Sequence, residues 1–399
     1  MQETQFGRGI STATTTDAAT SEAVDEARDQ LGESTGAALA IALIDPEYNA
    51  EAVIDGIQNA VGSVPIIGAT TAGEFTETQV AEGGIVIALL GSDGLSATTA
   101  LAGGVDEDTF TTVQSAIGEL PPAESVGGTH TAAVTFHNGL AGKGEEITLI
   151  TNQLLDGVPL AGGSAGDALD LEQTTVFTED GVSDDGVAIA LLGSETPFGL
   201  AANHGHTPLS DTYEVTDADE NVVYELDGEP AFEVWQREIA DIAAEEYGVD
   251  VDSLSDGGDE LADMMTKFEL GLPTGDDEHK IRWPGLTTST DDTLRFATGV
   301  PEGSAVRIMH SPPDDQIESA AEAANQALDD LDGSDPAGAL VFDCVCRGLI
   351  LGDEFDTAVD AIASEIGVPL AGFETYGEVC MEPGASSGYH NTTTSILLL

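Results

Sequence analysis

One short string occurs three times in this chain, and it constrains the fold more than any other feature of the sequence. It reads VPIIGATTAGE at residues 64–74, VPLAGGSAGD at 158–167 and VPLAGFETYGE at 368–378. Each copy follows an apolar run and a helix-like segment, and each is followed by another apolar run. A segment that recurs in this way is one supersecondary unit written several times. We therefore expect most glycines of the string to serve the geometry of the repeat.

The pattern around each copy predicts a β-α-β-α-β-β unit. Apolar residues at three- and four-residue spacing predict the helices, and short apolar runs predict the strands. The first two copies lie about 95 residues apart and the last two lie 210 apart, which leaves an insertion of roughly 115 residues near 198–303. Strands that alternate with helices pair in parallel, and the last strands of each unit add antiparallel edges. The prediction is an α/β fold with mixed sheets, three related units, and an insertion between units two and three.

The charge of the chain is extreme and dispersed. Asp and Glu number 74 against 10 Lys and Arg, which gives a formal net charge of −64. Such a surface repels itself in dilute buffer, but molar salt shortens the Debye length to roughly 3 Å. We therefore expect a cytoplasmic protein of a salt-accumulating halophile with an acidic surface. The alternative is an acidic partner for a basic protein, but dispersed charge forms no particular patch.

The same composition excludes two classes of partner. Nucleic-acid binding needs clustered Lys and Arg, which this chain lacks, so no nucleic acid is expected. No apolar run approaches the ~18 residues of a membrane span, and the N-terminus has no signal-peptide pattern, so no membrane is expected. Three cysteines, all after position 340, argue against a disulfide framework. No cofactor is expected.

The third copy is richer in chemistry than the other two. Its upstream strand ends in DCVCRG at residues 343–348, and YHNT at 389–392 follows downstream. Arg347 at a strand end suits bidentate binding of a carboxylate. With an acid and a neutral polar rim, it favours a zwitterion such as an amino acid. The candidate ligand-binding residues are Cys344, Arg347, Gly372, Thr375, Tyr376, Gly377, Glu378, His390 and Asn391. The alternative interpretation is a structural ion pair between Arg347 and Glu378.

Weaker candidates lie in the first two copies. In open α/β sheets, ligands bind at the carboxyl ends of strands, and glycine lets a ligand approach the backbone closely. The string places Glu74, Asp167 and Glu378 at equivalent positions, and the weaker candidates are Thr70, Glu74, Ser164 and Asp167. The alternative for these residues is a tight turn with a solvated acid.

Two further chemistries remain open. One is a zinc site, whose ligand types are present in Cys344, Cys346, Cys380 and His390, although their spacing matches no known zinc finger or ribbon. Gly162–Gly166 matches the G-x-S-x-G pattern of a hydrolase elbow with Ser164 as nucleophile. The other copies carry glycines in the same loop, which favours repeat geometry.

Several strings resemble the FIST family. Those at residues 64–74, 159–167 and 223–231 resemble a FIST N-terminal domain and its exit, and those at 342–347, 372–378 and 390–393 resemble a FIST C-terminal domain. The resemblance implies a FIST N-terminal-like domain at residues 1–210 and a FIST C-terminal-like domain at 211–399. It also implies a signal-transduction sensor that binds a small ligand such as an amino acid. No kinase, methyl-accepting or cyclase segment is present, so the sensor would signal through a separate protein partner.

Three functional hypotheses follow. The first is an intracellular sensor with a small ligand, which is not an enzyme. The second is a hydrolase-type enzyme that uses Ser164, or a carboxylate with Cys344. The third is a scaffold without a ligand. The ligand, the partner and the oligomeric state stay open at this stage.

Overall fold

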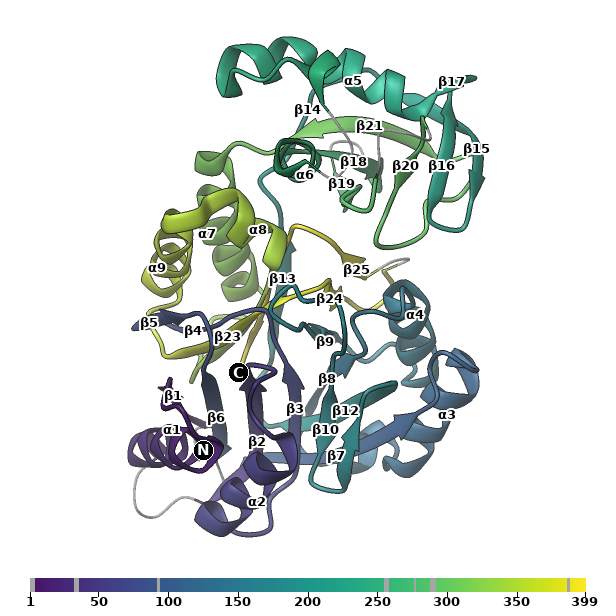
Figure 1. The fold of residues 1–399 in the computed structure, drawn as a ribbon. Coiled ribbons are helices and arrows are strands. Elements are labelled where there is room, and N and C mark those ends of the chain that lie inside the picture. The colour runs from purple at the N-terminus through teal and green to yellow at the C-terminus, as the bar shows by residue number, and fades with distance from the viewer. Residues whose placement is uncertain are drawn as a thin grey trace.

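A computed structural model describes residues 4–31, 36–91, 94–254, 258–275, 278–287, 292–385 and 388–399. It confirms the predicted α/β fold with mixed sheets (Figure 1). Three segments share one order of elements, and each has two short strands, a hairpin, that the predicted unit lacks. Among the described residues, no helix has both the length and the apolar character needed to cross a membrane.

The first unit comprises β1 (Gln5–Ser11), α1 (Thr16–Leu31), β2 (Ala37–Ile44), α2 (Ala50–Val61), β3 (Ile66–Thr70), β4 (Glu74–Thr76), β5 (Gln79–Ala81) and β6 (Ile85–Gly91). The second comprises β7 (Leu95–Gly103), α3 (Thr109–Glu119), η1 (Ala123–Ser125), β8 (His130–His137), α4 (Gly144–Leu154), β9 (Leu160–Ser164), β10 (Val176–Thr178), β11 (Gly181–Ser183) and β12 (Gly186–Ser194). The third comprises β13 (Gly199–Asn203), α7 (Pro313–Asp329), β22 (Ala339–Cys344), α8 (Val345–Leu351), η4 (Gly352–Glu354), α9 (Phe355–Ile366), β23 (Leu370–Thr375), β24 (Glu378–Met381), β25 (Tyr389–His390) and β26 (Thr394–Leu398).

The three units exchange their hairpins. The sheets run β1-β6-β2-β3-β10-β11, β7-β12-β8-β9-β24-β25 and β13-β26-β22-β23-β4-β5. Hairpin β4–β5 of unit one therefore completes the sheet of unit three, β10–β11 of unit two completes that of unit one, and β24–β25 of unit three completes that of unit two. Each sheet keeps one parallel pair, namely β2–β3, β8–β9 and β22–β23. The exchange closes the three sheets into a ring.

The exchanged hairpins explain one glycine of the repeated string. The facing pairs across the exchange are Gly68–Phe177, Gly372–Phe75 and Gly162–Val379. A Cβ on Gly68 would overlap the ring of Phe177, and a Cβ on Gly372 would overlap the ring of Phe75. The string therefore carries glycine where a neighbouring unit lays a large side chain on the sheet.

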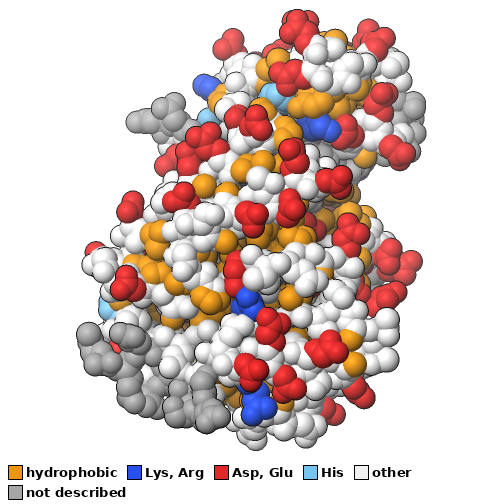
Figure 2. Space-filling model, turned by 90° about the vertical axis from the view of Figure 1, so that its left-hand side faces the viewer, with side chains coloured by type: hydrophobic (Ala, Val, Ile, Leu, Met, Phe, Trp, Pro, Cys, Tyr) orange, Lys and Arg blue, Asp and Glu red, His pale blue; other side chains and the backbone are white. Residues whose placement is uncertain are grey.

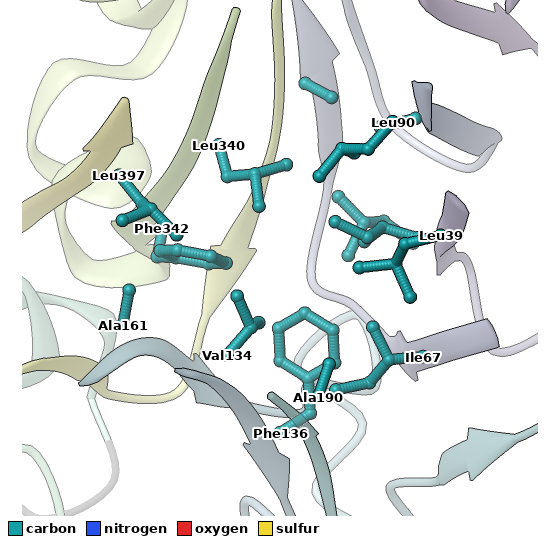
Figure 3. Packing of buried hydrophobic residues seen from close by; sticks show 14 of the residues in the cluster. Leu39, Ile67, Leu90, Val134, Phe136, Ala161, Ala190, Leu340, Phe342 and Leu397 are labelled. Carbon is teal, nitrogen blue, oxygen red and sulfur yellow. The ribbon is translucent and has the colours of Figure 1, made fainter. Parts of the chain in front are cut away.

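The inner faces of the sheets share one core. Phe136, Phe342 and Phe373 meet edge to face with ring centroids 5.6–6.0 Å apart. Leu39 and Ile67 of unit one approach the same centre (Figure 3). The outer faces bury separate apolar clusters beneath their own helices. Alternation along each strand thus sends one set of side chains to the ring's centre and the next to its helices.

The insertion forms a module with its own core around Trp235, and it lies at one end of the ring (Figure 1). Its elements are β14 (Thr207–Pro208), β15 (Tyr213–Asp219), β16 (Val222–Leu226), β17 (Glu229–Pro230), α5 (Ala231–Ile242), η2 (Ala243–Tyr247), η3 (Val251–Ser253), α6 (Asp259–Lys267), β18 (Phe268–Pro273), β19 (His279–Arg282), β20 (Leu294–Arg295) and β21 (Ala305–His310). The expected start of the insertion near residue 198 was wrong, because β13 pairs with β26 and belongs to the ring.

Candidate functional site

The three copies of the repeated string meet at the carboxyl ends of the parallel strands. Backbone hydrogen bonds join them in a cycle. Glu374 N donates to Gly73 O at 2.8 Å, Ser164 N donates to Gly377 O at 2.8 Å, and Gly166 N donates to Thr70 O at 2.9 Å. The loops are therefore joined into one layer at the end of the ring that faces the module (Figure 1).

Two copies build the same contact from the pattern Thr-x-Gly-Glu. Thr71 Oγ1 donates to Glu74 Oε1, and Thr375 Oγ1 donates to Glu378 Oε1. The other oxygen of Glu378 accepts from Thr393 N at 3.2 Å. Burial raises the pKa of Glu74 to about 8 and the pKa of Glu378 well above its usual value. Both carboxyls are fully enclosed and tie their own loop in place, so the structure gives Glu378 a structural contact in place of an exposed ligand-binding acid.

Asp167 does not occupy the position equivalent to those two glutamates. Glu74 pairs with Phe373 and Glu378 with Gly163, and the residue in that register in unit two is Val176, opposite Ala69. The expected equivalence was wrong because unit two carries extra residues between its string and its hairpin. Asp167 instead accepts three backbone N–H groups of that extra segment, from Leu171, Glu172 and Gln173.

Arg347 is a structural cation. Its side chain is completely buried, and its Nε lies 2.5 Å from Asp343 Oδ1. The remaining contacts run to helix α7, where Nη1 donates to the side chains of Gln316 and Ser319, and Nη2 donates to Gln316 O at 2.9 Å. The prediction that Arg347 binds the carboxylate of a ligand was therefore wrong, because the guanidinium is buried and its donors are taken by protein partners. The alternative pair with Glu378 is also wrong, since the partner is Asp343.

Ser164 lies between His137 and Tyr389. Its Oγ is 3.0 Å from His137 Nε2 and 2.9 Å from the hydroxyl of Tyr389. All three side chains are buried, and burial lowers the pKa of His137 to about 4. A hydrolase elbow joins a strand to a helix, whereas Ser164 ends β9 and leads into a loop and hairpin β10–β11.

The other predicted residues are placed as follows. Thr70 Oγ1 accepts from Thr175 N at 2.9 Å, and the Nε2 of His390 is 3.3 Å from Cys380 O. Burial, followed by the nearby Lys280, lowers the pKa of His390 to about 4. Asn391 is buried, and its Oδ1 has no hydrogen-bond partner among the described residues. A Cβ on Gly377 would overlap the hydroxyl of Tyr389, so the string needs a glycine there. Within the described ranges, no group of three or more His, Cys, Asp and Glu side chains is arranged to hold a metal.

A mixed apolar and acidic patch lies where the ring meets the module. Cys344, Val345 and Cys346 at the start of α8 pack against Ala72, Trp283 and Tyr376, and we call these six residues together with Glu374 the junction patch. Trp283 comes from the module, directly after β19, and its Nε1 donates to Thr266 Oγ1 at 3.4 Å. Sequence reasoning placed Cys344 and Tyr376 among the candidates but missed Trp283 and Glu374.

Glu374 is the distinctive group of the junction patch. Its carboxyl lies over the bare backbone of Gly73 and Gly348, where a Cβ on either glycine would collide with it. Its side chain is partly exposed and makes no hydrogen bond or ion pair with any residue that the structure describes. Burial and the nearby carboxyls of Asp343 and Glu74 raise its pKa well above the usual value. The repeated string did hold a signal for it, because units one and two carry Thr70 and Ser164 at this position.

The thiols beside Glu374 are poor nucleophiles. Burial raises the pKa of Cys344 well above its usual value. The thiol of Cys344 lowers the pKa of Cys346, but burial and the carboxyls of Glu269 and Glu378 outweigh this effect. Neither thiol is therefore ionised near neutral pH, and reaction at sulfur needs the thiolate. The arrangement favours binding over nucleophilic chemistry at these cysteines.

Polar contacts hold the module on the ring. Arg282 of β19 reaches across to α4, where its Nη2 lies 2.7 Å from Glu145 Oε2. Thr392 Oγ1 donates to Glu269 Oε1 at 2.7 Å. The other oxygen of Glu269 lies 3.5 Å from His206 Nε2, and neither of these two atoms has a hydrogen-bond partner among the described residues. Burial and then Arg347 lower the pKa of His206 to about 3, and burial raises the pKa of Glu269 well above its usual value, so both side chains are neutral near pH 7.

Two domain families cover most of the chain. Residues 38–229 match the FIST N domain, and residues 231–381 match the FIST C domain. This chain belongs to the FIST family. FIST domains are associated with signal-transduction sensing and small-ligand binding. The two matches meet at residues 229–231, whereas the structure divides the chain into the ring and the module at 207–310.

An uncharacterized protein of Methanocaldococcus jannaschii is 22% identical to this FIST protein over 290 residues. The match covers 69% of this chain, and the chain spans about half (54%) of that relative. A crystal structure of cyanuric acid hydrolase from A. caulinodans is similar over 48% of this chain and 72% of its own, with 12% identity and a TM-score of 0.28. A likeness at that score carries no argument about function.

Proposed function

We propose that this chain is an intracellular sensory protein that binds a small ligand of the amino-acid class at the junction patch and signals through a separate protein. The observation that carries the proposal is Glu374, a partly exposed carboxyl that makes no hydrogen bond or ion pair with any described residue. It lies against Gly348 of α8, the helix whose first turn packs against Trp283 and Tyr376. An ammonium group is attracted both to a carboxylate and to an aromatic face. The patch therefore supplies what the cationic end of an amino acid needs.

The geometry changes which end of the ligand is recognised. The predicted clamp on a carboxylate rested on Arg347, whose donors are occupied by Asp343, Gln316 and Ser319. An ammonium beside Glu374 also lowers the pKa of that carboxyl, because an opposite charge favours the ionised form. Ligand binding at this site is thus expected to release a proton from Glu374.

Thermal unfolding at molar KCl tests the proposal with a panel of amino acids. Each is paired with its N-acetyl derivative, which has the same side chain but no ammonium group. We expect the amino acids to raise the Tm and the N-acetyl derivatives to have no effect. We expect Glu374→Gln to weaken binding about 10- to 100-fold, since a hydrogen bond to a charged group contributes about 1.5–3 kcal/mol. The matched control is Glu365→Gln, an exposed position on α9.

The alternatives have distinct outcomes in this experiment. Equal binding of the N-acetyl derivatives, or full binding by Glu374→Gln, would show that the junction patch is not the site. If no compound in the panel raises the Tm, the proposed amino-acid ligand is wrong, and the result favours the hypothesis of a scaffold without a ligand.

One observation favours a second candidate function. The contact of 3.0 Å between Ser164 Oγ and His137 Nε2 is the geometry of a nucleophile and its base. Both side chains are buried, and Tyr389 covers the hydroxyl. Ester and amide substrates with Ser164→Ala as control decide this point. Activity that Ser164→Ala abolishes would establish a hydrolase, and equal rates in the two proteins would exclude it.

A further inference from the structure

Unit two carries a loop that the other units lack. In units one and three the string runs directly into the hairpin, whereas residues 168–175 separate Asp167 from β10 in unit two. Residues 168–173 are all exposed. Ala168, Leu169 and Leu171 have φ values of 53°, 68° and 54°, a left-handed conformation that side chains with a Cβ rarely adopt. Backbone strain of this kind persists where the surroundings hold it, and it clusters at functional segments.

Two anchors hold the loop in this conformation. Asp167 accepts three of its backbone N–H groups at 2.7–3.0 Å. The hydroxyl of Tyr376 accepts from Leu169 N at 2.8 Å and donates to Asp167 Oδ1. Tyr376 is also part of the junction patch. One tyrosine of unit three therefore touches both the proposed ligand site and the loop.

The loop presents apolar side chains to solvent. Leu169 is 42% exposed and Leu171 is 54% exposed. Thr174 links the loop to the segment that follows β8, because its Oγ1 donates to Asn138 Oδ1 at 3.0 Å. Leu140 in that segment is 37% exposed. Leu169 and Leu171 belong to none of the hydrophobic clusters of the described residues, and two exposed leucines on one fixed loop offer a partner an apolar contact.

Charge and shape indicate what kind of partner fits. Asp170 and Glu172 alternate with the two leucines and are exposed. A hollow of about 340 Å³ adjoins the loop at Gln173 and Thr175, and Glu51 is the one charged side chain among the described residues that line it. Acidic groups around apolar anchors complement a pocket bordered by Lys or Arg. A second copy of this chain fits poorly, because its 10 Lys and Arg against 74 Asp and Glu offer few cations to set against Asp170 and Glu172.

We propose that the loop surface, defined as residues 168–173 with Leu140 and the adjoining hollow, docks the separate signalling protein. The partner receives Leu169 and Leu171 in an apolar pocket and sets Lys or Arg side chains against Asp170, Glu172 and Glu51. Tyr376 connects this surface to the junction patch, so a ligand there acts on the loop. The inference rests on the proposed sensory function and adds the surface through which the signal leaves.

Photo-crosslinking locates the partner. One version of the full chain carries a photoreactive residue in place of Leu171. A control version carries it in place of Leu149, an exposed leucine of α4. Both versions are irradiated in the native cell. We expect one protein to be captured from position 171 and not from position 149. Absence of any adduct from position 171, or an adduct to a second copy of this chain, would overturn the proposal.

The captured protein is then purified and its affinity for the full chain is measured. We expect the double variant Leu169→Ser/Leu171→Ser to bind at least tenfold more weakly and Asp170→Asn/Glu172→Gln to lower the salt dependence of binding. The matched control is Phe110→Ser/Leu149→Ser, which removes two exposed apolar side chains, 47% and 38% exposed, from the helices of unit two. Unchanged affinity of the leucine variant would also overturn the proposal.

Thermal shift with amino acids separates this inference from the sensory function. The variant Leu169→Ser/Leu171→Ser is expected to fold, since both side chains are exposed, and to keep its ligand-dependent rise in Tm. Loss of partner binding with retained ligand binding supports the loop surface. Retained partner binding with retained ligand binding overturns the loop surface alone and leaves the ligand site standing.

Discussion

At the scale of single residues, the carboxyls with a raised pKa at this end of the ring divide into buried ones that serve the fold and one that has no partner among the described residues. Glu74 and Glu378 each accept a hydrogen bond from the threonine of their own Thr-x-Gly-Glu pattern. Asp343 neutralises Arg347. Glu374 alone in this group lacks a hydrogen bond to any described residue and is partly exposed. This difference directs the functional proposal away from Glu378 and toward Glu374.

The raised pKa of Glu74 predicts a pH dependence of stability. The folded chain holds this proton until about pH 8, whereas the unfolded chain releases it near the usual value of 4.5, so folding loses stability as pH rises between these values. At molar KCl we expect the free energy of unfolding to fall with rising pH less steeply in Glu74→Gln than in the unchanged chain. The two slopes are expected to differ by up to about 1.4 kcal/mol per pH unit. Denaturant titrations at several pH values measure this. Exposed Glu51→Gln is the control, and identical slopes in all three proteins would refute the contact.

Arg347 predicts a stability effect in place of a ligand effect. We expect Arg347→Ala to lower the free energy of unfolding by about 3–5 kcal/mol, because it leaves the buried Asp343 without its partner. The double variant Arg347→Met/Asp343→Asn is expected to recover part of this loss. Chemical denaturation measures both proteins. An Arg347→Ala protein of normal stability that fails to bind amino acids would restore the carboxylate clamp.

The sequence could show that Arg is scarce in this chain, but the expected position of Arg347 at a strand end was wrong, because β22 ends at Cys344 and Arg347 lies in helix α8. The sequence also could not show the partners of Arg347. Asp343 is four residues away, yet Gln316 and Ser319 belong to a helix about thirty residues earlier. Trp283 was missed for the same reason, since it reaches the junction patch from the inserted module. Glu374 was within reach of sequence reasoning, because the repeat aligns it with Thr70 and Ser164.

At the scale of elements, the hairpin exchange explains why the repeated string carries a glycine at Gly68 and at the equivalent Gly372. The apolar periodicity predicted the mixed α/β class, and the helix-like segments predicted before the three copies correspond to α2, α4 and α9. The hairpins escaped prediction because β4, β5, β10 and β11 have three residues each, too short for a clear alternation. Their partners also lie in a different unit, which local sequence cannot specify.

The glycine beneath each hairpin gives a test of the exchange. We expect Gly68→Ala to lower the free energy of unfolding by about 1–3 kcal/mol, because the added Cβ would displace Phe177. The control is Gly118→Ala on helix α3, where the added Cβ meets open space. That change is expected to stabilise the protein by about 0.5–1 kcal/mol. Equal effects of the two substitutions, measured by denaturant titration, would contradict the packing.

At the scale of the whole molecule, the three units form a ring and the module lies over the end where the strand loops meet (Figure 1). Figure 2 shows Asp and Glu side chains spread over one face of both parts, with few Lys and Arg. Most of the few cations take part in structural ion pairs, such as Arg8 with Glu77, Arg282 with Glu145 and Arg347 with Asp343. Little positive charge is left to offset the acids.

The net charge of −64 predicts that salt stabilises the folded chain. Raising KCl from 0.1 M to 1 M shortens the Debye length from about 10 Å to about 3 Å and weakens repulsion among the acids. We expect the free energy of unfolding and the Tm to rise over this range and then to level off. Thermal unfolding at a series of KCl concentrations checks this. A Tm that does not change with KCl would argue against adaptation to high salt.

The central claim, a ligand at the junction patch, is tested most directly by fluorine NMR of the chain labelled with 5-fluorotryptophan. The two tryptophans give two signals, one from Trp283 in the patch and one from Trp235 in the core of the module. Trp283→Phe assigns them. We predict that an amino acid which raises the Tm shifts the Trp283 signal and leaves the Trp235 signal unchanged. A Trp283 signal that stays in place at saturating ligand would contradict the site.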